Sequence, residues 1–254
     1  MTRFETSTND NSREPAAAPA RVRMAVEFSL HGDLRYLSHH DEMRMLTRTV
    51  IRSRWPLRFS QGFNPKPRFT LPLPRSVGVA SESELAVFEL CERGDLASMA
   101  RELIRQFPAG VEFKRAGWHP RGTPHPARVT YRVDLNTPVP GVEQRIAELL
   151  ACTTLPVMRR GEPGSAARRI DIRGRIETIR ASDSNLRMEL TYVDQRTARP
   201  TEILELLGLD AGRCASRITR EAIEWDTKLF DPEDGVVIAE DVNIEQGKEA
   251  KTGS

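Results

Sequence analysis

The sequence predicts an α+β protein made of two ferredoxin-like (βαββαβ-type) subdomains in tandem, with disordered termini. Residues 21–118 alternate between period-2 and period-3.6 apolar patterns, in the order β-α-β-β-α-β. Residues 119–127 hold three prolines and one glycine, which is typical of a linker. Residues 128–231 then form a second α+β pattern, which is similar to the first in the order of its elements but not in its amino-acid sequence.

In the first half, alternating apolar residues predict a half-buried strand over residues 21–30. Ser38 is the expected N-cap of a helix that ends near residue 53, with an apolar face formed by Met43, Leu46 and Val50. The other expected elements are strands at 57–60, 68–73, 84–90 and 111–116, and a helix at 95–106.

The second half is expected to hold strands at 128–135, 157–160, 169–179 and 186–193, and helices at 142–151 and 202–207. The segment 215–225 fits either a helix or a strand. Residues 1–20 are polar and then rich in alanine and proline, so they are expected to be disordered. Residues 232–254 are acidic and are expected to be largely disordered, apart from a short apolar run at 236–239 that could pack locally.

Composition limits the class of protein. No segment approaches the roughly 20 apolar residues that cross a bilayer, and the start of the chain holds no apolar block typical of a secretory signal. We therefore expect a cytoplasmic protein without a membrane partner. Cys91, Cys152 and Cys214 are too far apart for a metal-binding motif, so they are expected to be reduced structural thiols. Neither a metal nor a cofactor is expected.

The most distinctive segment is strongly basic. Residues 41–76 hold eight basic residues against two acids. Arg44, Arg48 and Arg52 recur every four residues, so they share a helix face, and that face is not the apolar one. Guanidinium groups bind phosphates through paired hydrogen bonds, and interleaved aromatic rings stack on unpaired RNA bases. The sequence therefore predicts an RNA-binding surface formed by Arg44, Arg48, Arg52, Arg54, Arg58, Phe63, Lys66, Arg68 and Arg75.

Other interpretations of this segment stay open. The arginines could pair with Glu82, Glu84 or Glu89 of the same chain, or could dock an acidic protein surface. His39, at a helix start among basic residues, could act on a phosphodiester as a metal-independent endoribonuclease. Neighbouring residues on a helix point in different directions, however, so Ser38, His39 and Asp41 cannot form a triad. A capping role is favoured, and catalysis is less expected than binding.

Three motifs in this segment are similar to those of a known family. Leu37–Asp41 fits LSHxD, residues 60–67 fit SxGFNPxP, and residues 71–78 fit LPLPxxVG. In this order they resemble the signature of the radical-SAM-linked protein family, and a looser resemblance covers residues 21–225. His40 stands where an apolar residue is usual. The residues that match the first two motifs are Ser38, His39, Asp41, Gly62, Phe63, Asn64, Pro65 and Pro67.

The resemblance implies a partner. Members of this family occur beside, or fused to, radical SAM enzymes, which carry an iron–sulfur cluster. This chain has no CxxxCxxC run and cannot hold that cluster itself. Together, the resemblance and the basic segment predict a non-catalytic accessory protein of a radical SAM enzyme. It would bind structured RNA, such as tRNA or ribosomal RNA, through the basic helix and the loop that follows it.

Overall fold

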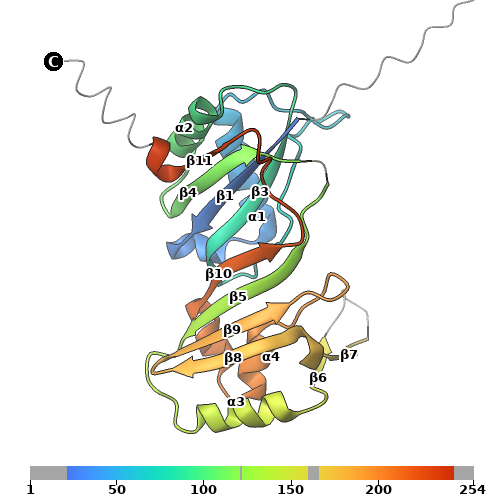
Figure 1. The fold of residues 1–254 in the computed structure, drawn as a ribbon, viewed down its shortest axis with the longest axis vertical. Coiled ribbons are helices and arrows are strands. Elements are labelled where there is room, and N and C mark those ends of the chain that lie inside the picture. Colours follow the sequence, from blue (N-terminus) through green and yellow to red (C-terminus); the bar gives the residue numbers. More distant parts are fainter. Residues whose placement is uncertain (1–21, 121, 160–165, 243–254) are drawn as a thin grey trace, which may run out of the picture.

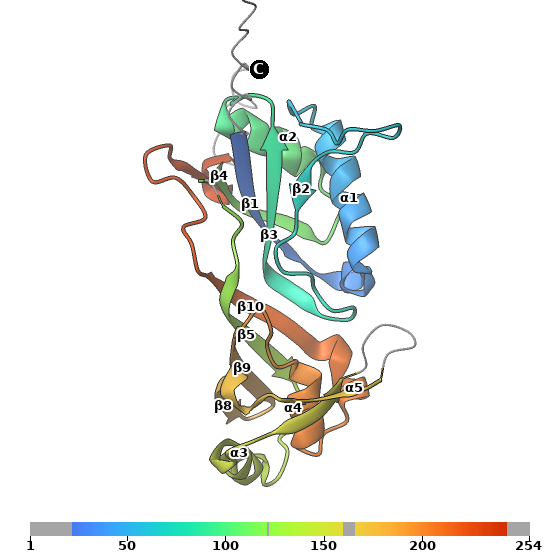
Figure 2. The ribbon, with the colours of Figure 1, turned by 90° about the vertical axis from the view of Figure 1, so that its right-hand side faces the viewer.

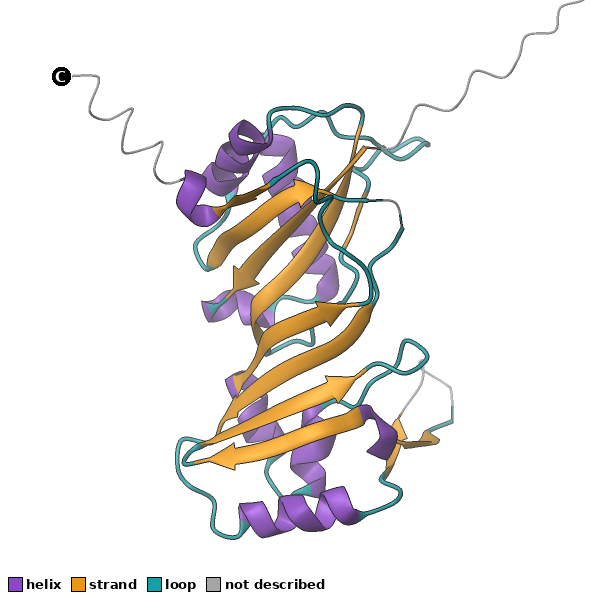
Figure 3. Ribbon diagram, in the orientation of Figure 1, coloured by secondary structure: helices purple, strands orange, loops and turns teal. Residues whose placement is uncertain are grey.

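The computed structural model describes residues 22–120, 122–159 and 166–242 (Figure 1). The predictions for residues 1–20 and for the end of the C-terminal tail therefore lie outside the described residues. Within the described part, a nine-stranded mixed sheet runs along the length of the molecule, and helices pack against it (Figure 3). The mixed α+β class is as predicted.

The first half follows the predicted order of elements. Its elements are β1 (Val22–Leu30), η1 (Gly32–Tyr36), α1 (His39–Arg52), β2 (Phe69–Thr70), β3 (Ala80–Leu90), α2 (Leu96–Gln106) and β4 (Val111–Trp118). β1 lies between β3 and β4, β2 pairs with the outer side of β3, and all these pairs are antiparallel. Figure 2 shows α1 running beside the sheet, with the segment between α1 and β2 looping out beyond the helix.

The second half has a comparable arrangement. Its elements are β5 (Pro126–Asp134), α3 (Val142–Ala151), β6 (Pro156–Arg159), β7 (Arg168–Asp171), η2 (Arg173–Arg175), β8 (Ile176–Ser182), β9 (Asn185–Thr191), α4 (Pro200–Leu206), α5 (Ala211–Cys214), η3 (Ala215–Arg217) and β10 (Ile218–Trp225). The strands lie in the order β10-β5-β9-β8, with antiparallel neighbours, and β6 and β7 form a separate hairpin. In the first half, the first strand, β1, lies between β4 and β3. In the second half, the first strand, β5, lies in the same way between β10 and β9.

Among the described residues, the buried apolar side chains form two large cores and a third, small cluster of Ala25, Leu85, Val87 and Leu229. In the first half, Met24, Val26 and Phe28 of β1 pack with Leu46 and Val50 of α1 and with residues of α2. The alternating pattern predicted this inward face of β1, and the 3.6-residue period predicted the face of α1. In the second half, β5, β8, β9 and β10 pack with α3 and α4 in a core of their own.

The two halves share one sheet because β3 and β10 pair in parallel, through Ala80 with Thr219 and Ser81 with Arg220. Antiparallel neighbours fill the rest of the sheet. Residues 119–125 connect β4 to β5, and the predicted linker overlaps the start of β5. The sheet therefore continues across the sequence boundary that the prolines suggest.

Several predicted elements differ from the structure. Only Phe69 and Thr70 form a strand within 68–73, and Leu57 and Phe59 make isolated bridges. The prolines that flank these positions lack the N–H that a ladder needs. The expected strand 169–179 is broken by a 3-10 turn between β7 and β8, and the ambiguous segment 215–225 becomes mainly strand β10.

The short apolar run at 236–239 forms an edge strand, which fits the expectation that it could pack locally, and residues 243–254 of the expected disordered tail lie outside the described residues. β11 (Val236–Ile238) pairs with the edge of β4, and Val242 is buried in the first core. The physical reason is that β4 otherwise ends the sheet with unpaired backbone groups, which an apolar segment of β-branched residues can cover.

Candidate nucleic-acid interface

Ser38 fixes the start of α1. Its Oγ accepts a hydrogen bond from the backbone N–H of Asp41 at 3.2 Å, which confirms the predicted N-cap. Its hydroxyl also donates to the Asp41 carboxylate at 2.6 Å. This hydrogen bond, together with the nearby Arg44, holds the pKa of Asp41 below its ordinary value. Both motif residues therefore have a structural role at the helix start.

The two faces of α1 differ in chemistry, as predicted. Leu46 and Val50 are fully buried against the sheet. Arg44, Arg48 and Arg52 are exposed on a different face. Because four residues of an α-helix rise by about 6 Å, the three arginines are spaced evenly along one line.

These arginines line a groove of about 650 Å³ between α1 and the C-terminal end of α2. A fourth arginine, Arg105 in the last turn of α2, lines the same groove. We call Arg44, Arg48, Arg52 and Arg105 the basic groove. Sequence reasoning missed Arg105 because α2 reaches α1 only in the folded chain.

The four arginines differ in their partners. The guanidinium of Arg44 lies 3.5 Å from the carboxylate of Asp41, and that of Arg105 lies 2.6 Å from the carboxylate of Glu102. Each is an ion pair within its own helix. Arg48 and Arg52 make no side-chain hydrogen bond or ion pair with any described residue. Two guanidinium groups of the basic groove therefore remain available to an external anion.

The loop between α1 and β2 is a separate exposed feature. Its base is closed by backbone hydrogen bonds from Ser60 to Lys66 and from Arg68 to Arg58, each 2.8 Å. Phe63 at its tip is fully exposed, and Gly62 has a φ of +128°, which other residues rarely adopt. Of the other motif residues, Asn64 and Pro65 are exposed and Pro67 is buried.

The loop cations do not join the basic groove. Arg68 pairs with Glu89 at 3.1 Å and lines a different depression, which also contains Arg23. Arg54 lines a third depression with Glu92 and Arg93. Arg58 is half-buried and Lys66 is exposed. The predicted RNA-binding set is thus divided between the groove and the loop.

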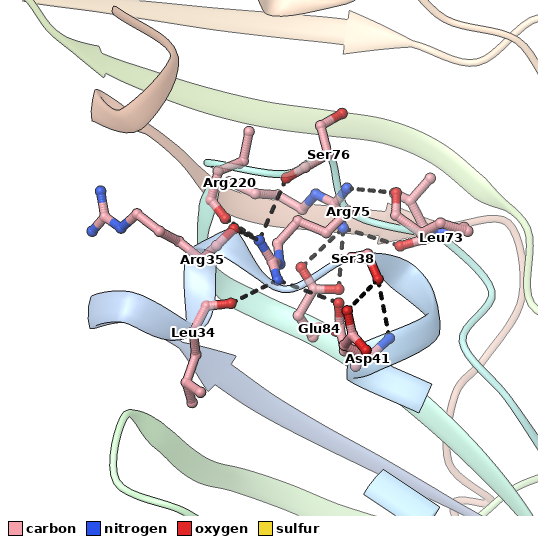
Figure 4. A network of polar contacts seen from close by, with 12 residues as sticks. Leu34, Arg35, Ser38, Asp41, Leu73, Arg75, Ser76, Glu84 and Arg220 are labelled. Atoms are coloured by element: carbon pink, nitrogen blue, oxygen red, sulfur yellow. Dashed lines mark hydrogen bonds and ion pairs between the residues drawn. The ribbon is translucent and has the colours of Figure 1, made fainter. Parts of the chain in front are cut away.

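Arg75 corrects the prediction, because its side chain is completely buried. It donates hydrogen bonds to the backbone carbonyls of Leu34 and Arg35, at 3.2 and 2.7 Å (Figure 4). Its guanidinium also pairs with the Glu42 carboxylate, with an N–O distance of 3.4 Å. Leu34 and Arg35 also accept backbone hydrogen bonds from Leu37 and Gly78, so the guanidinium adds a second hydrogen bond to each carbonyl and ties the turn before α1 to the segment before β3. Arg75 is not accessible to RNA.

Arg220 of β10 is a second buried arginine next to Arg75. It donates to both carboxylate oxygens of Glu84 on β3, at 2.9 and 3.2 Å, and to the carbonyl of Leu73 (Figure 4). It also donates to the carbonyl of Pro74. Glu84 therefore pairs with Arg220 and not with an arginine of the basic segment. We call Glu42, Arg75, Glu84 and Arg220 the buried charge cluster.

The buried charge cluster holds the LPLPxxVG motif between the two halves. Its members come from α1, the segment before β3, β3 itself and β10. Burial, and then the charge of Glu84, raise the pKa of Glu42 to about 7, although Arg75 and Arg220 act in the opposite direction. One oxygen of Glu42 has no hydrogen-bond partner in the described ranges. This motif therefore has a structural explanation in the joining of the halves.

The remaining candidate residues give no catalytic arrangement among the residues described. His39 is exposed at the first position of α1, while the hydroxyl of Ser38 is directed to Asp41. In the same described ranges, no group of three or more His, Cys, Asp or Glu side chains could hold a metal ion. Cys91, Cys152 and Cys214 are free thiols, of which only Cys214 is buried. No helix in the described ranges is both long enough and apolar enough to span a membrane.

Comparison with known proteins identifies a family and no function. No curated protein matches the chain. A family described as "Uncharacterized protein conserved in bacteria (DUF2344)" matches residues 23–200. The match includes α1, the exposed loop and the LPLPxxVG motif, and ends before β10. Because it spans more than half of the sequence, the chain belongs to the DUF2344 family.

Proposed function

We propose that this protein is a non-catalytic accessory protein of a radical SAM enzyme and that it binds structured RNA through the basic groove. One observation carries the RNA proposal: Arg48 and Arg52 are exposed, have no partner within the part of the chain that the structure describes, and line the same groove as Arg44 and Arg105. The partner enzyme rests on the resemblance of the three sequence motifs to the radical-SAM-linked family.

The geometry of α1 favours a polyphosphate backbone as the ligand. Arginines about 6 Å apart along one line can contact successive phosphates of a strand. Each guanidinium can form two parallel hydrogen bonds with a phosphate, which a lysine cannot do. The exposed loop with Phe63 and Lys66 extends the proposed surface beyond the groove, and Arg54, Arg58 and Arg68 are secondary contacts in this proposal.

The fold proposal is more specific than the α+β class. We propose that the two halves are ferredoxin-like subdomains that share one sheet. The equivalent strand orders, β4-β1-β3-β2 and β10-β5-β9-β8, support this relationship. In the second half, the β6–β7 hairpin is then an insertion before the second core strand.

The RNA proposal is tested by measuring the affinity of the purified protein for bulk tRNA and ribosomal RNA at several salt concentrations. Phosphate contacts require the logarithm of the affinity to fall linearly with the logarithm of salt, by roughly 0.7 per contact for single strands. Arg48→Gln and Arg52→Gln should each reduce this slope by roughly 0.7.

Arg180→Gln is the matched control, because Arg180 is an exposed arginine on β8 that has no hydrogen-bond or ion-pair partner among residues 22–120, 122–159 and 166–242. This variant should bind RNA as the parent does. Absence of RNA binding, or an affinity that does not change with salt, would remove the proposal. Co-purification with an enzyme after nuclease treatment would then favour the docking alternative, and RNA cleavage that His39→Ala abolishes would favour the nuclease.

The partner proposal needs its own experiment. Tagged protein purified under anaerobic conditions from the native cells should bring down an enzyme that carries an iron–sulfur cluster and binds S-adenosylmethionine. Recovery of other proteins without such an enzyme would contradict the partner and leave the RNA proposal unaffected.

A further inference from the structure

We infer that the basic groove binds an unpaired segment of RNA in preference to a duplex, an inference that rests on the proposed function. The observation is the chemistry of the groove itself. Its arginines stand along α1 and at the end of α2, and apolar side chains line the space between them. These apolar residues are Leu34, Leu37, Met45, Phe107 and Pro108.

The two kinds of lining match the two parts of a single strand. A strand has a charged backbone on one side and bases with apolar faces on the other. Arginines bind such a backbone, and apolar or aromatic side chains contact the faces of the bases, which adds to the affinity for each stacked base. In a duplex the bases are already stacked and paired, so a protein meets mainly phosphates and ribose hydroxyls. An apolar lining would then have no partner.

The groove also has the volume of a binding site, and its aromatic side chain is held in place by contacts within the protein. Its volume of about 650 Å³ lies within the range of roughly 300–1,000 Å³ that is usual for ligand sites. Phe107 is held by backbone hydrogen bonds from its N–H to Leu103 and Ile104, and its ring centroid lies 6.1 Å from that of Phe28. The aromatic surface is therefore positioned before any ligand arrives.

Charge complementarity selects a nucleic acid over an apolar peptide. Of the residues that the structure describes, four arginines and a single acid, Asp41, line the groove. Asp41 is already engaged by the hydroxyl of Ser38 and lies 3.5 Å from Arg44. An occupant with repeated negative charges and apolar surfaces between them meets both requirements.

The test compares two forms of one oligonucleotide by fluorescence anisotropy. The probes are a labelled, unstructured RNA of roughly 12 nucleotides, within the usual site sizes of ~4–16 nucleotides, and the same strand annealed to its complement. We expect the single strand to bind at least about tenfold more tightly than the duplex, which corresponds to the stacking of about one base.

Variants separate the apolar lining from the arginines. Leu37→Ser should weaken single-strand binding by about fivefold and leave the salt slope unchanged, because it removes an apolar contact and no charge. Leu206→Ser, at an exposed leucine of α4, is the matched control and should bind as the parent does. Arg48→Gln, in contrast, should reduce the salt slope. Circular dichroism of each variant verifies the fold.

The outcomes distinguish this inference from the proposed function. Equal affinity for duplex and single strand, with no effect of Leu37→Ser, would overturn the preference for unpaired RNA, while salt-dependent binding of both would still support the RNA proposal. Lack of salt-dependent binding to either probe would remove both. Tight single-strand binding that Leu37→Ser weakens supports both.

Discussion

Two sets of arginines in this protein have opposite environments. Arg75 and Arg220 are buried, each paired with a glutamate and with backbone carbonyls. Arg48 and Arg52 are exposed and have no partner among the described residues. The buried pair joins α1, β3 and β10, whereas the exposed pair lines a groove open to solvent.

The difference shows what an arginine contributes in each setting. A buried guanidinium has lost its hydration, so its partners must compensate, and removing one member leaves an uncompensated charge. An exposed guanidinium keeps its water and costs little to remove, but it can exchange that water for a phosphate. The first set should therefore control stability and the second set binding.

The largest effect is expected for Arg220→Ala. This change leaves Glu84 charged and buried without its partner, which should lower the free energy of unfolding by about 3–5 kcal/mol in urea denaturation. Arg48→Ala is the matched comparison and should change the same quantity by less than about 0.5 kcal/mol.

A double variant verifies the cause. Glu84→Leu with Arg220→Met replaces the ion pair by apolar side chains and should recover most of the lost stability. If Arg220→Ala and Arg48→Ala had the same stability, the contrast between the buried and exposed arginines would have no energetic basis.

Glu42→Gln should give the next largest change in the free energy of unfolding, and the size of this change should depend on pH. The pKa of Glu42 is raised from 4.5 to about 7, so in this range the folded protein holds the proton more tightly than the unfolded chain does. The stability of the parent should then fall as pH rises from 4.5 through 7, whereas glutamine does not titrate. Relative to the parent, the free energy of unfolding of the variant should therefore rise by on the order of 1–3 kcal/mol across this pH range.

The measurement is urea denaturation of both proteins at several pH values. Parallel stability profiles would mean that Glu42 titrates as an ordinary exposed carboxylate. Glu205→Gln, at an exposed glutamate of α4, is a suitable control and should follow the parent.

Arg68→Ala tests a case between the two sets of arginines, because Arg68 is partly exposed and also forms an ion pair. Its ion pair with Glu89 spans 3.1 Å, with 42% of the arginine side chain exposed. Partly solvated pairs of this kind contribute ~0–1 kcal/mol, so we expect a loss of stability within that range. We also expect a smaller change in the salt slope of RNA binding than for Arg48→Gln. A stability loss close to that of Arg220→Ala would show that Arg68 belongs with the buried arginines.

The first half illustrates how far sequence reasoning reaches. The N-cap at Ser38, the buried face of α1 with Leu46 and Val50, and the inward face of β1 were all predictable. Each depends on residues within a few positions of one another, where backbone periodicity dictates which side chains share a face. The exposed face of Arg44, Arg48 and Arg52 follows from the same rule.

The α+β class, the two long helices and the main strands of the first half, and the row of arginines along α1 could thus be predicted from the amino-acid sequence alone. The burial of Arg75, the position of Arg105 in the basic groove and the pairing of β3 with β10 became visible in the folded chain and not before. The reason is distance along the chain: Arg220 and Glu84 are 136 residues apart, and no local period encodes a contact between them. Whether a side chain is buried depends on what the folded chain places around it. A basic residue in a proline-rich loop therefore has the same local sequence pattern whether its side chain faces solvent or pairs with a buried glutamate.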